Sequence, residues 1–280
     1  MRIPITLLYV FSMLSAARPA LAQTLEADPQ RMERRIRALA RFGASEAGSQ
    51  RVAFSEADVE AREYFQTLMR DAGLEVQVDF AGNLIGHRAG RDNELPPIMF
   101  GSHLDTVPNG GAYDGTVGCL GALEVMEVLK SNDRVTDHPL ELIVFADEEG
   151  GLTGSRSLIG ALGPDTLMEK SHSGKTIAEG IKFLGGDPSR LAEVKRSKGD
   201  LKAFLELHIE QGAVLENESI DIGIVEGIVG IEWWDVTIEG AANHAGTTPM
   251  DMRQDAVIAG SMFALAVNEI VRSFDGQQVG

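Results

Sequence analysis

The sequence of 280 residues is short of cysteine and of basic residues. Cys119 is the only cysteine, so the chain cannot form an intramolecular disulfide, and its apolar neighbours predict a buried side chain rather than a nucleophile. Lysine and arginine number 25 against 42 acidic residues, which gives a formal net charge of -17. Because nucleic acids and anionic membranes are bound through basic surfaces, this balance argues against both as partners.

The sequence also lacks a uniformly apolar run long enough to span a bilayer, which takes about 20 residues. Its first 22 residues instead have the pattern of a cleavable signal peptide. Arg2 precedes an apolar run from Ile3 to Leu14, and Ala20 and Ala22 place small residues at the expected cleavage site. We therefore expect an exported protein, located in the periplasm, with no membrane anchor after cleavage.

The middle of the chain, residues 23–215, predicts an α/β domain. Ser55 has the position of a helix cap, and Gly82-Asn83 forms a turn between two alternating segments. The predicted elements are a helix at 56–72, a hairpin at 74–85, a strand at 98–100, a helix at 116–129 and strands at 140–146 and 203–207. Buried strands separated by helices indicate a mixed, largely parallel sheet.

The pattern changes after residue 215. Residues 222–229 and 231–238 predict two strands joined at Gly230, and residues 255–271 carry a long apolar stripe at helical spacing. We interpret residues 216–280 as the beginning of a second domain.

Polar residues follow three of the predicted strands at the point where each strand ends. His103 and Asp105 follow the first, Glu148 and Glu149 the second, and His208 the third. In a parallel sheet these ends meet at one edge, where ligands bind. A single histidine or aspartate there is ordinarily a turn residue or a satisfied core group. Three repeats favour a shared site, because buried charges are costly unless they are paired or bound to metal.

Imidazole and carboxylate groups together are typical ligands of zinc and related divalent ions. His103, Asp114, Glu149 and His208 have this chemistry, and Asp114 lies in a glycine-rich loop where the backbone can approach a metal closely. A two-metal centre needs a bridging carboxylate between ions about 3.5–4 Å apart. These four residues are therefore candidate metal ligands.

Glu148 and Glu149 are adjacent and cannot take the same role from the same direction. If Glu149 binds metal, Glu148 can act as the general base on the attacking water and later protonate the leaving nitrogen. Asp105 can hold the imidazole of His103 in the metal-binding tautomer.

Five motifs occur in order along the chain. They are GSHLDTV at 101–107, YDG at 113–115, DEEG at 147–150, HIEQG at 208–212 and NHAGTTPM at 243–250. Together they resemble the M20-type metallohydrolases, and within them the hydantoinase/carbamoylase amidases. That branch includes N-carbamoyl-L-amino-acid hydrolases, β-ureidopropionases and allantoate amidohydrolases.

The resemblance implies two divalent metal ions, either zinc or manganese, cobalt or nickel. It implies that His103 and His208 each bind one ion, that Asp114 bridges them and that Glu149 completes one coordination shell. Glu148 is then the general base.

The resemblance also assigns roles to residues beyond the metal ligands. It implies that His244, from the second domain, polarises the scissile carbonyl and stabilises the oxyanion, and that Gln211 contacts the substrate. Residues 216–280 then begin an inserted α+β lid and dimerisation domain, and the protein is expected to be a homodimer.

The expected reaction is hydrolysis of the carbamoyl or ureido C–N bond of a small molecule, an N-carbamoyl-L-amino acid or allantoate, with release of ammonia and carbon dioxide. One alternative is an M20 peptidase or deacylase. Another is an inactive remnant that only binds metal or dimerises. Chains of the family continue further and carry another metal-binding histidine, so we interpret these 280 residues as C-terminally truncated. We expect weak binding of the second metal and little activity.

Overall fold

The computed structural model describes residues 25–230 and 232–275, which form two compact units divided after Val214. The predicted signal peptide, residues 1–22, lies outside the described residues.

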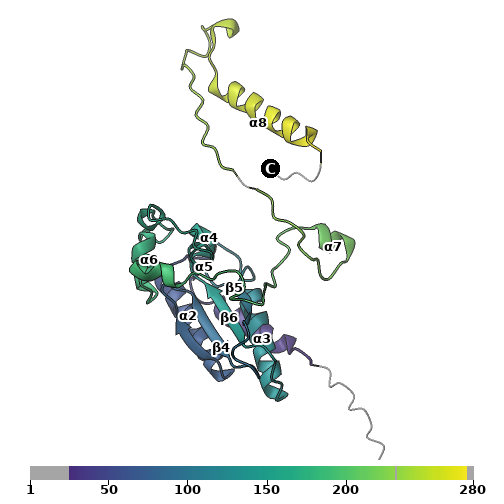
Figure 1. The fold of residues 1–280 in the computed structure, drawn as a ribbon. Coiled ribbons are helices and arrows are strands. Elements are labelled where there is room, and N and C mark those ends of the chain that lie inside the picture. Colours follow the sequence, from purple (N-terminus) through teal and green to yellow (C-terminus); the bar gives the residue numbers. More distant parts are fainter. Residues whose placement is uncertain (1–24, 231, 276–280) are drawn as a thin grey trace, which may run out of the picture. The chain divides into compact units, whose positions relative to one another are not determined.

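The first unit is built on a five-stranded mixed sheet with the strand order β3-β4-β6-β5-β7. Its strands β4, β6 and β5 are labelled in Figure 1. The strands are β3 (Glu75–Val78), β4 (Leu84–Arg88), β5 (Ile98–His103), β6 (Leu140–Phe145) and β7 (Ala203–Leu205). β4 pairs antiparallel with β3 and with β6, whereas β5 pairs parallel with β6 and with β7. The mixed α/β sheet predicted from the sequence is confirmed.

The strand register brings the polar residues that follow the strands to one edge of the sheet. His103, the last residue of β5, is the register partner of Phe145, the last residue of β6. Asp147 and Glu148 therefore follow closely beside His103. Leu205 ends β7 opposite Phe100, so that His208 lies three residues past the end of β7.

Strand β6 is buried on both faces, and its sequence is apolar apart from Glu141. Leu140, Leu142 and Val144 join one hydrophobic cluster, and Ile143 and Phe145 join another. This alternation follows from the two-residue period of a strand, which sends successive side chains to opposite faces. The sheet is therefore covered on both sides, as expected for parallel strands.

The first face of the sheet is covered by α1 (Pro29–Leu39), α2 (Glu56–Asp71) and α3 (Thr116–Ser131). Phe65 and Met69, four residues apart on α2, are fully buried there. The hydroxyl of Ser55 accepts a hydrogen bond from the backbone N–H of Asp58, so the predicted cap is confirmed. Helix α3 connects β5 to β6 along the chain, as predicted.

Shorter elements complete the first unit. They are β1 (Ala44–Ser45), β2 (Gly48–Ser49), α4 (Glu148–Gly151), α5 (Thr153–Leu158), η1 (Thr166–Met168), α6 (Ile177–Phe183) and η2 (Pro188–Glu193). Helices α4 and α5 lie at the end of the sheet where β6 stops (Figure 1). The segment after β6 therefore leads directly to the edge of the sheet where the polar residues lie.

A buried asparagine ties this edge to the hairpin. Asn83 is inaccessible to solvent, and its Oδ1 accepts a hydrogen bond from the backbone N–H of Ala146 at 3.0 Å. Its Nδ2 donates to Asp79 Oδ2 at 2.8 Å and to the carbonyl of Gly154 at 3.4 Å. The side chain thus satisfies backbone groups on both sides of α4, where an unpaired group would be costly.

The second unit holds α7 (Val214–Glu218), which begins at the boundary, together with η3 (Met250–Met252) and α8 (Ala256–Ser273). Asp255 caps α8 by accepting from the N–H groups of Val257 and Ile258, which confirms the helix predicted at 255–271. Among the described helices, α8 alone is long and apolar enough to cross a membrane, a test that core helices of soluble proteins also pass.

The two strands predicted in the second unit are not formed by its described residues. Residues 222–230 and 232–238 have no strand pairing, and Ile224 and Ile228 are about nine-tenths exposed, at 89% and 92%. A strand requires a partner for its backbone hydrogen bonds, and an apolar pattern indicates a buried face without supplying that partner.

Candidate metal centre

Three of the predicted ligands come together at the edge of the sheet. His103 ends β5, Asp114 precedes α3, and His208 follows β7, and their ligand atoms all lie within 4.8 Å of one another. Asp114 Oδ1 lies 3.1 Å from His208 Nε2 and 3.6 Å from His103 Nε2. One carboxylate oxygen is therefore shared between two imidazoles.

The surroundings of Asp114 show that this donor set fits a cation. Its Oδ1 is buried and accepts no hydrogen bond from any described residue, although two imidazole nitrogens are close. Its Oδ2 accepts from Gln211 Nε2 at 2.6 Å. A buried carboxylate oxygen without a partner is costly. A divalent ion held by His103, Asp114 and His208 would remove that cost, and zinc accepts these ligands.

The imidazole tautomers are also suited to metal binding. His103 Nδ1 lies 3.0 Å from the backbone oxygen of Asp105, and His208 Nδ1 lies 2.8 Å from that of Ile209. A carbonyl oxygen can only accept, so Nδ1 of the neutral ring carries the proton in both cases. The lone pair of each Nε2 is then available on the side of Asp114.

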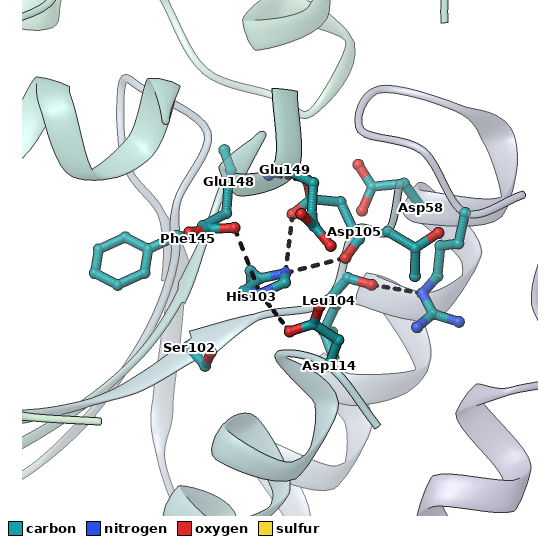
Figure 2. A network of polar contacts seen from close by, with 12 residues as sticks. Asp58, Ser102, His103, Leu104, Asp105, Asp114, Phe145, Glu148 and Glu149 are labelled. Atoms are coloured by element: carbon teal, nitrogen blue, oxygen red, sulfur yellow. Dashed lines mark hydrogen bonds and ion pairs between the residues drawn. The ribbon is translucent and has the colours of Figure 1, made fainter. Parts of the chain in front are cut away.

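Asp105 contributes differently from the prediction. The contact that fixes the His103 tautomer comes from its backbone carbonyl, whereas its Oδ1 is 3.8 Å from His103 Nδ1. Its Oδ2 accepts a hydrogen bond from the backbone N–H of Glu149 at 3.0 Å (Figure 2). Asp105 therefore connects the His103 loop to the start of α4.

The two adjacent glutamates differ in position. Glu148 Oε2 lies 3.5 Å from His103 Nε2, and Figure 2 shows this side chain directed at the imidazole. Glu149, a predicted ligand, is not in the group of three that lie within 4.8 Å, and it reaches the centre through its backbone N–H. The backbone turns between β6 and α4 at Asp147, which adopts a left-handed conformation with φ 52° and ψ 53°.

The charges around Glu148 favour a role as a base. Burial raises its pKa above the usual value, His103 opposes this, and nearby carboxylates including Asp105 and Glu206 raise it further. Burial lowers the pKa of His103, but the carboxylates of Asp105 and Glu148 outweigh this effect and raise it. A carboxylate with a raised pKa holds an abstracted proton more strongly, which suits proton transfer near neutral pH.

A model of peptidase family M20/M25/M40 matches residues 99–277, which include all five sequence motifs. The chain belongs to this family. The N-carbamoyl-L-amino acid amidohydrolase of Geobacillus stearothermophilus is 40% identical over 249 residues, which cover 87% of this chain and 61% of the relative. The allantoate amidohydrolase of Escherichia coli is 37% identical over 237 residues, which cover 82% of this chain and 57% of the relative.

Solved structures agree with this assignment. A hydantoinase/carbamoylase family amidase from Burkholderia ambifaria has a TM-score of 0.71 at 36% identity, covering 89% of this chain and 62% of that one. The resemblance predicted from the motifs is confirmed. The M20 chain spans about three fifths of the length of the relatives it matches.

The remaining predicted residues lie in different places. Gln211, predicted to contact substrate, donates to Asp114 in this structure. His244 belongs to the second unit, and its Nδ1 accepts a hydrogen bond from the backbone N–H of Gly246 at 3.1 Å.

Sequence reasoning missed Glu206, whose Oε1 accepts a hydrogen bond from Ser102 Oγ at 2.5 Å beside the metal centre. Its position two residues before the candidate ligand His208 was the available signal.

Replacing Asp58 with asparagine is expected to stabilise the M20 chain more at pH 7 than at pH 4. Burial raises the pKa of Asp58 from 3.8 to about 6. The folded state therefore binds this proton more tightly than the unfolded chain. The stability that the protonated Asp58 contributes to the folded state is present below about pH 4 and is lost as the pH rises through 6. A pKa difference of this size corresponds to at most about 3 kcal/mol.

Urea unfolding of the wild type and Asp58→Asn between pH 4 and pH 7 measures this effect. The amide oxygen of the introduced asparagine can still accept the hydrogen bond that the Asp58 carboxylate receives from the backbone N–H of Phe54 at 2.9 Å. Asp71→Asn, at an exposed position on the same helix, is the control. A difference in unfolding free energy that does not change with pH would contradict the prediction.

Proposed function

We propose that this chain carries the metal centre and general base of an amidohydrolase that cleaves the ureido C–N bond of an N-carbamoyl-L-amino acid. The observation that supports it most is Glu148 Oε2, 3.5 Å from His103 Nε2, beside a carboxylate oxygen of Asp114 shared by two imidazoles. Relatives named N-carbamoyl-L-amino-acid amidohydrolase are 38–41% identical, and the allantoate amidohydrolase is 37% identical.

The proposed cofactor is a pair of divalent ions, zinc or manganese, cobalt or nickel. His103 and His208 would hold one ion each, Asp114 would lie between them, and Glu149 would complete one shell. When bound, such ions polarise a carbonyl and make water a stronger acid. The shared position of Asp114 Oδ1 supports the bridging role.

Glu148 moves the proton in the proposed reaction. It takes a proton from the attacking water as the water oxygen bonds to the ureido carbon. When the C–N bond breaks, Glu148 returns the proton to the leaving nitrogen. The carbamic acid that remains releases carbon dioxide, so that ammonia, carbon dioxide and the amino acid are the products.

His244 is the proposed donor to the substrate carbonyl. Because His244 Nδ1 accepts from the N–H of Gly246, a neutral ring carries its proton on Nε2. That N–H is suited to stabilise an oxyanion. Gln211 is proposed to contact the substrate. The proposed protein is a homodimer in which the second unit acts as a lid and an interface. It is proposed to be exported to the periplasm.

The test is a substrate panel with the full 280-residue chain and added zinc or manganese. We expect slow release of ammonia from N-carbamoyl-L-amino acids, less from allantoate, and none after treatment with a chelator. Amine release from dipeptides or N-acetyl-amino acids without ammonia would favour a peptidase or deacylase. Bound metal without any hydrolysis would favour a binding module.

A further inference from the structure

Arg51 is a buried arginine whose hydrogen bonds go to backbone carbonyls and a hydroxyl. It is 1% exposed, and no described carboxylate forms an ion pair with it. Burying a charged group is costly unless its donors are satisfied. The hydrogen bonds that satisfy this guanidinium therefore indicate which segments it holds together.

The guanidinium contacts three separate segments of the first unit. Its Nε donates to the carbonyl of Leu104 at 2.6 Å. One Nη donates to the carbonyls of Leu39 at 2.8 Å and Phe42 at 3.3 Å, at the end of α1. The other Nη donates to Thr116 Oγ1 at 3.4 Å, in the first residue of α3.

Two of these contacts adjoin predicted metal ligands. Leu104 lies between His103 and Asp105, and the backbone N–H of Thr106 donates to the carbonyl of Arg51 at 2.9 Å. Arg51 therefore holds this loop on both sides of Asp105, whose own carbonyl orients the imidazole of His103.

The Thr116 contact reaches the other ligand loop. Thr116 follows Asp114 by two residues, and Gly115 between them has φ 60° and lies against the carbonyl of His103. A side chain at Gly115 would collide with that carbonyl, so the two ligand loops are packed directly on each other. The guanidinium of Arg51 spans them.

The charge of Arg51 acts on the same region. The carboxylates of Asp58 and Asp105 interact with it electrostatically, and Figure 2 shows Asp105 beside His103. The fixed positive charge of Arg51 reduces the repulsion between these acids, while the N–H donors of its planar guanidinium hold the His103 and Asp114 loops. Lysine would supply the positive charge but not the planar set of N–H donors.

We propose that Arg51 is a positioning residue that holds the His103 and Asp114 loops in register and thereby sets the affinity of the centre for divalent ions. This inference rests on the metal centre of the proposed function.

The experiment measures zinc affinity of the untagged full chain by competition with a chromogenic chelator, together with urea unfolding. Arg51→Lys and Arg51→Met are expected to bind zinc about 10- to 100-fold more weakly, as is typical when the partners that orient metal ligands are lost. Arg35→Met is the matched control, because Arg35 pairs with Glu127 at 2.6 Å and joins α1 to α3 away from the ligands. It should lower stability and leave zinc affinity unchanged.

The outcomes separate this inference from the proposed function. If the wild type binds zinc and folded Arg51→Lys binds it with the same affinity, the positioning role alone is overturned. The positioning role is also overturned if Arg35→Met loses as much zinc affinity as the Arg51 variants do. A wild type that binds no zinc overturns both. If Arg51→Met does not fold, Arg51→Lys decides, because it retains the buried charge.

Discussion

Replacing Glu148 with glutamine is expected to lower the rate of ammonia release about 10²- to 10⁴-fold, the usual contribution of a general acid or base. Glutamine has nearly the same shape, but its amide cannot accept the proton of the attacking water. Glu148 faces His103 Nε2 at 3.5 Å, and its proposed role is proton transfer instead of metal binding, so bound metal should be unchanged.

Release of labelled carbon dioxide from a carbamoyl-¹⁴C substrate measures this loss even where wild-type turnover is slow, and elemental analysis measures the metal. Glu46→Gln, at an exposed position between β1 and β2, is the control. A loss of metal parallel to the loss of rate would assign Glu148 to metal binding instead of proton transfer.

Asp114→Asn is expected to lower both metal binding and turnover, the latter by about 10³-fold. A metal ion contributes several kcal/mol to transition-state stabilisation, and each 1.36 kcal/mol is a factor of ten. Gln211 Nε2 donates to Oδ2 of Asp114, so the amide oxygen of asparagine would turn towards Gln211. Its NH₂ group would then face the two imidazole nitrogens and oppose a cation there.

Zinc affinity and metal content of Asp114→Asn, compared with the exposed control Asp92→Asn, test this prediction. Wild-type zinc affinity in Asp114→Asn would show that the shared oxygen is not a ligand, whatever the effect on rate.

The elements of the first unit could be predicted because their signals are local. Ser55 caps α2 through a hydrogen bond to a residue three positions away. The largely apolar run of β6 indicated a buried strand, and the helix predicted between β5 and β6 indicated that these two strands are parallel. These features depend on periodicity and capping, which neighbours along the chain determine.

The ligand types were also readable, because polar residues directly after buried strands must be satisfied at one edge of the sheet. His103, Asp114 and His208 are brought together there, although 105 residues separate the first from the last. Spacing along the chain could not show how closely Glu148 approaches His103, because that distance depends on the turn at Asp147.

The sequence by itself determined the sheet, its helices, the family and the kinds of group that could bind a metal. Only the tertiary structure decided that the backbone of Asp105 orients His103, that Arg51 joins two ligand loops, and that residues 222–230 lack strand pairing. Each of these depends on which distant group meets a hydrogen-bond donor or acceptor. A residue pattern specifies the need for a partner, whereas packing of the whole chain determines which partner is in reach.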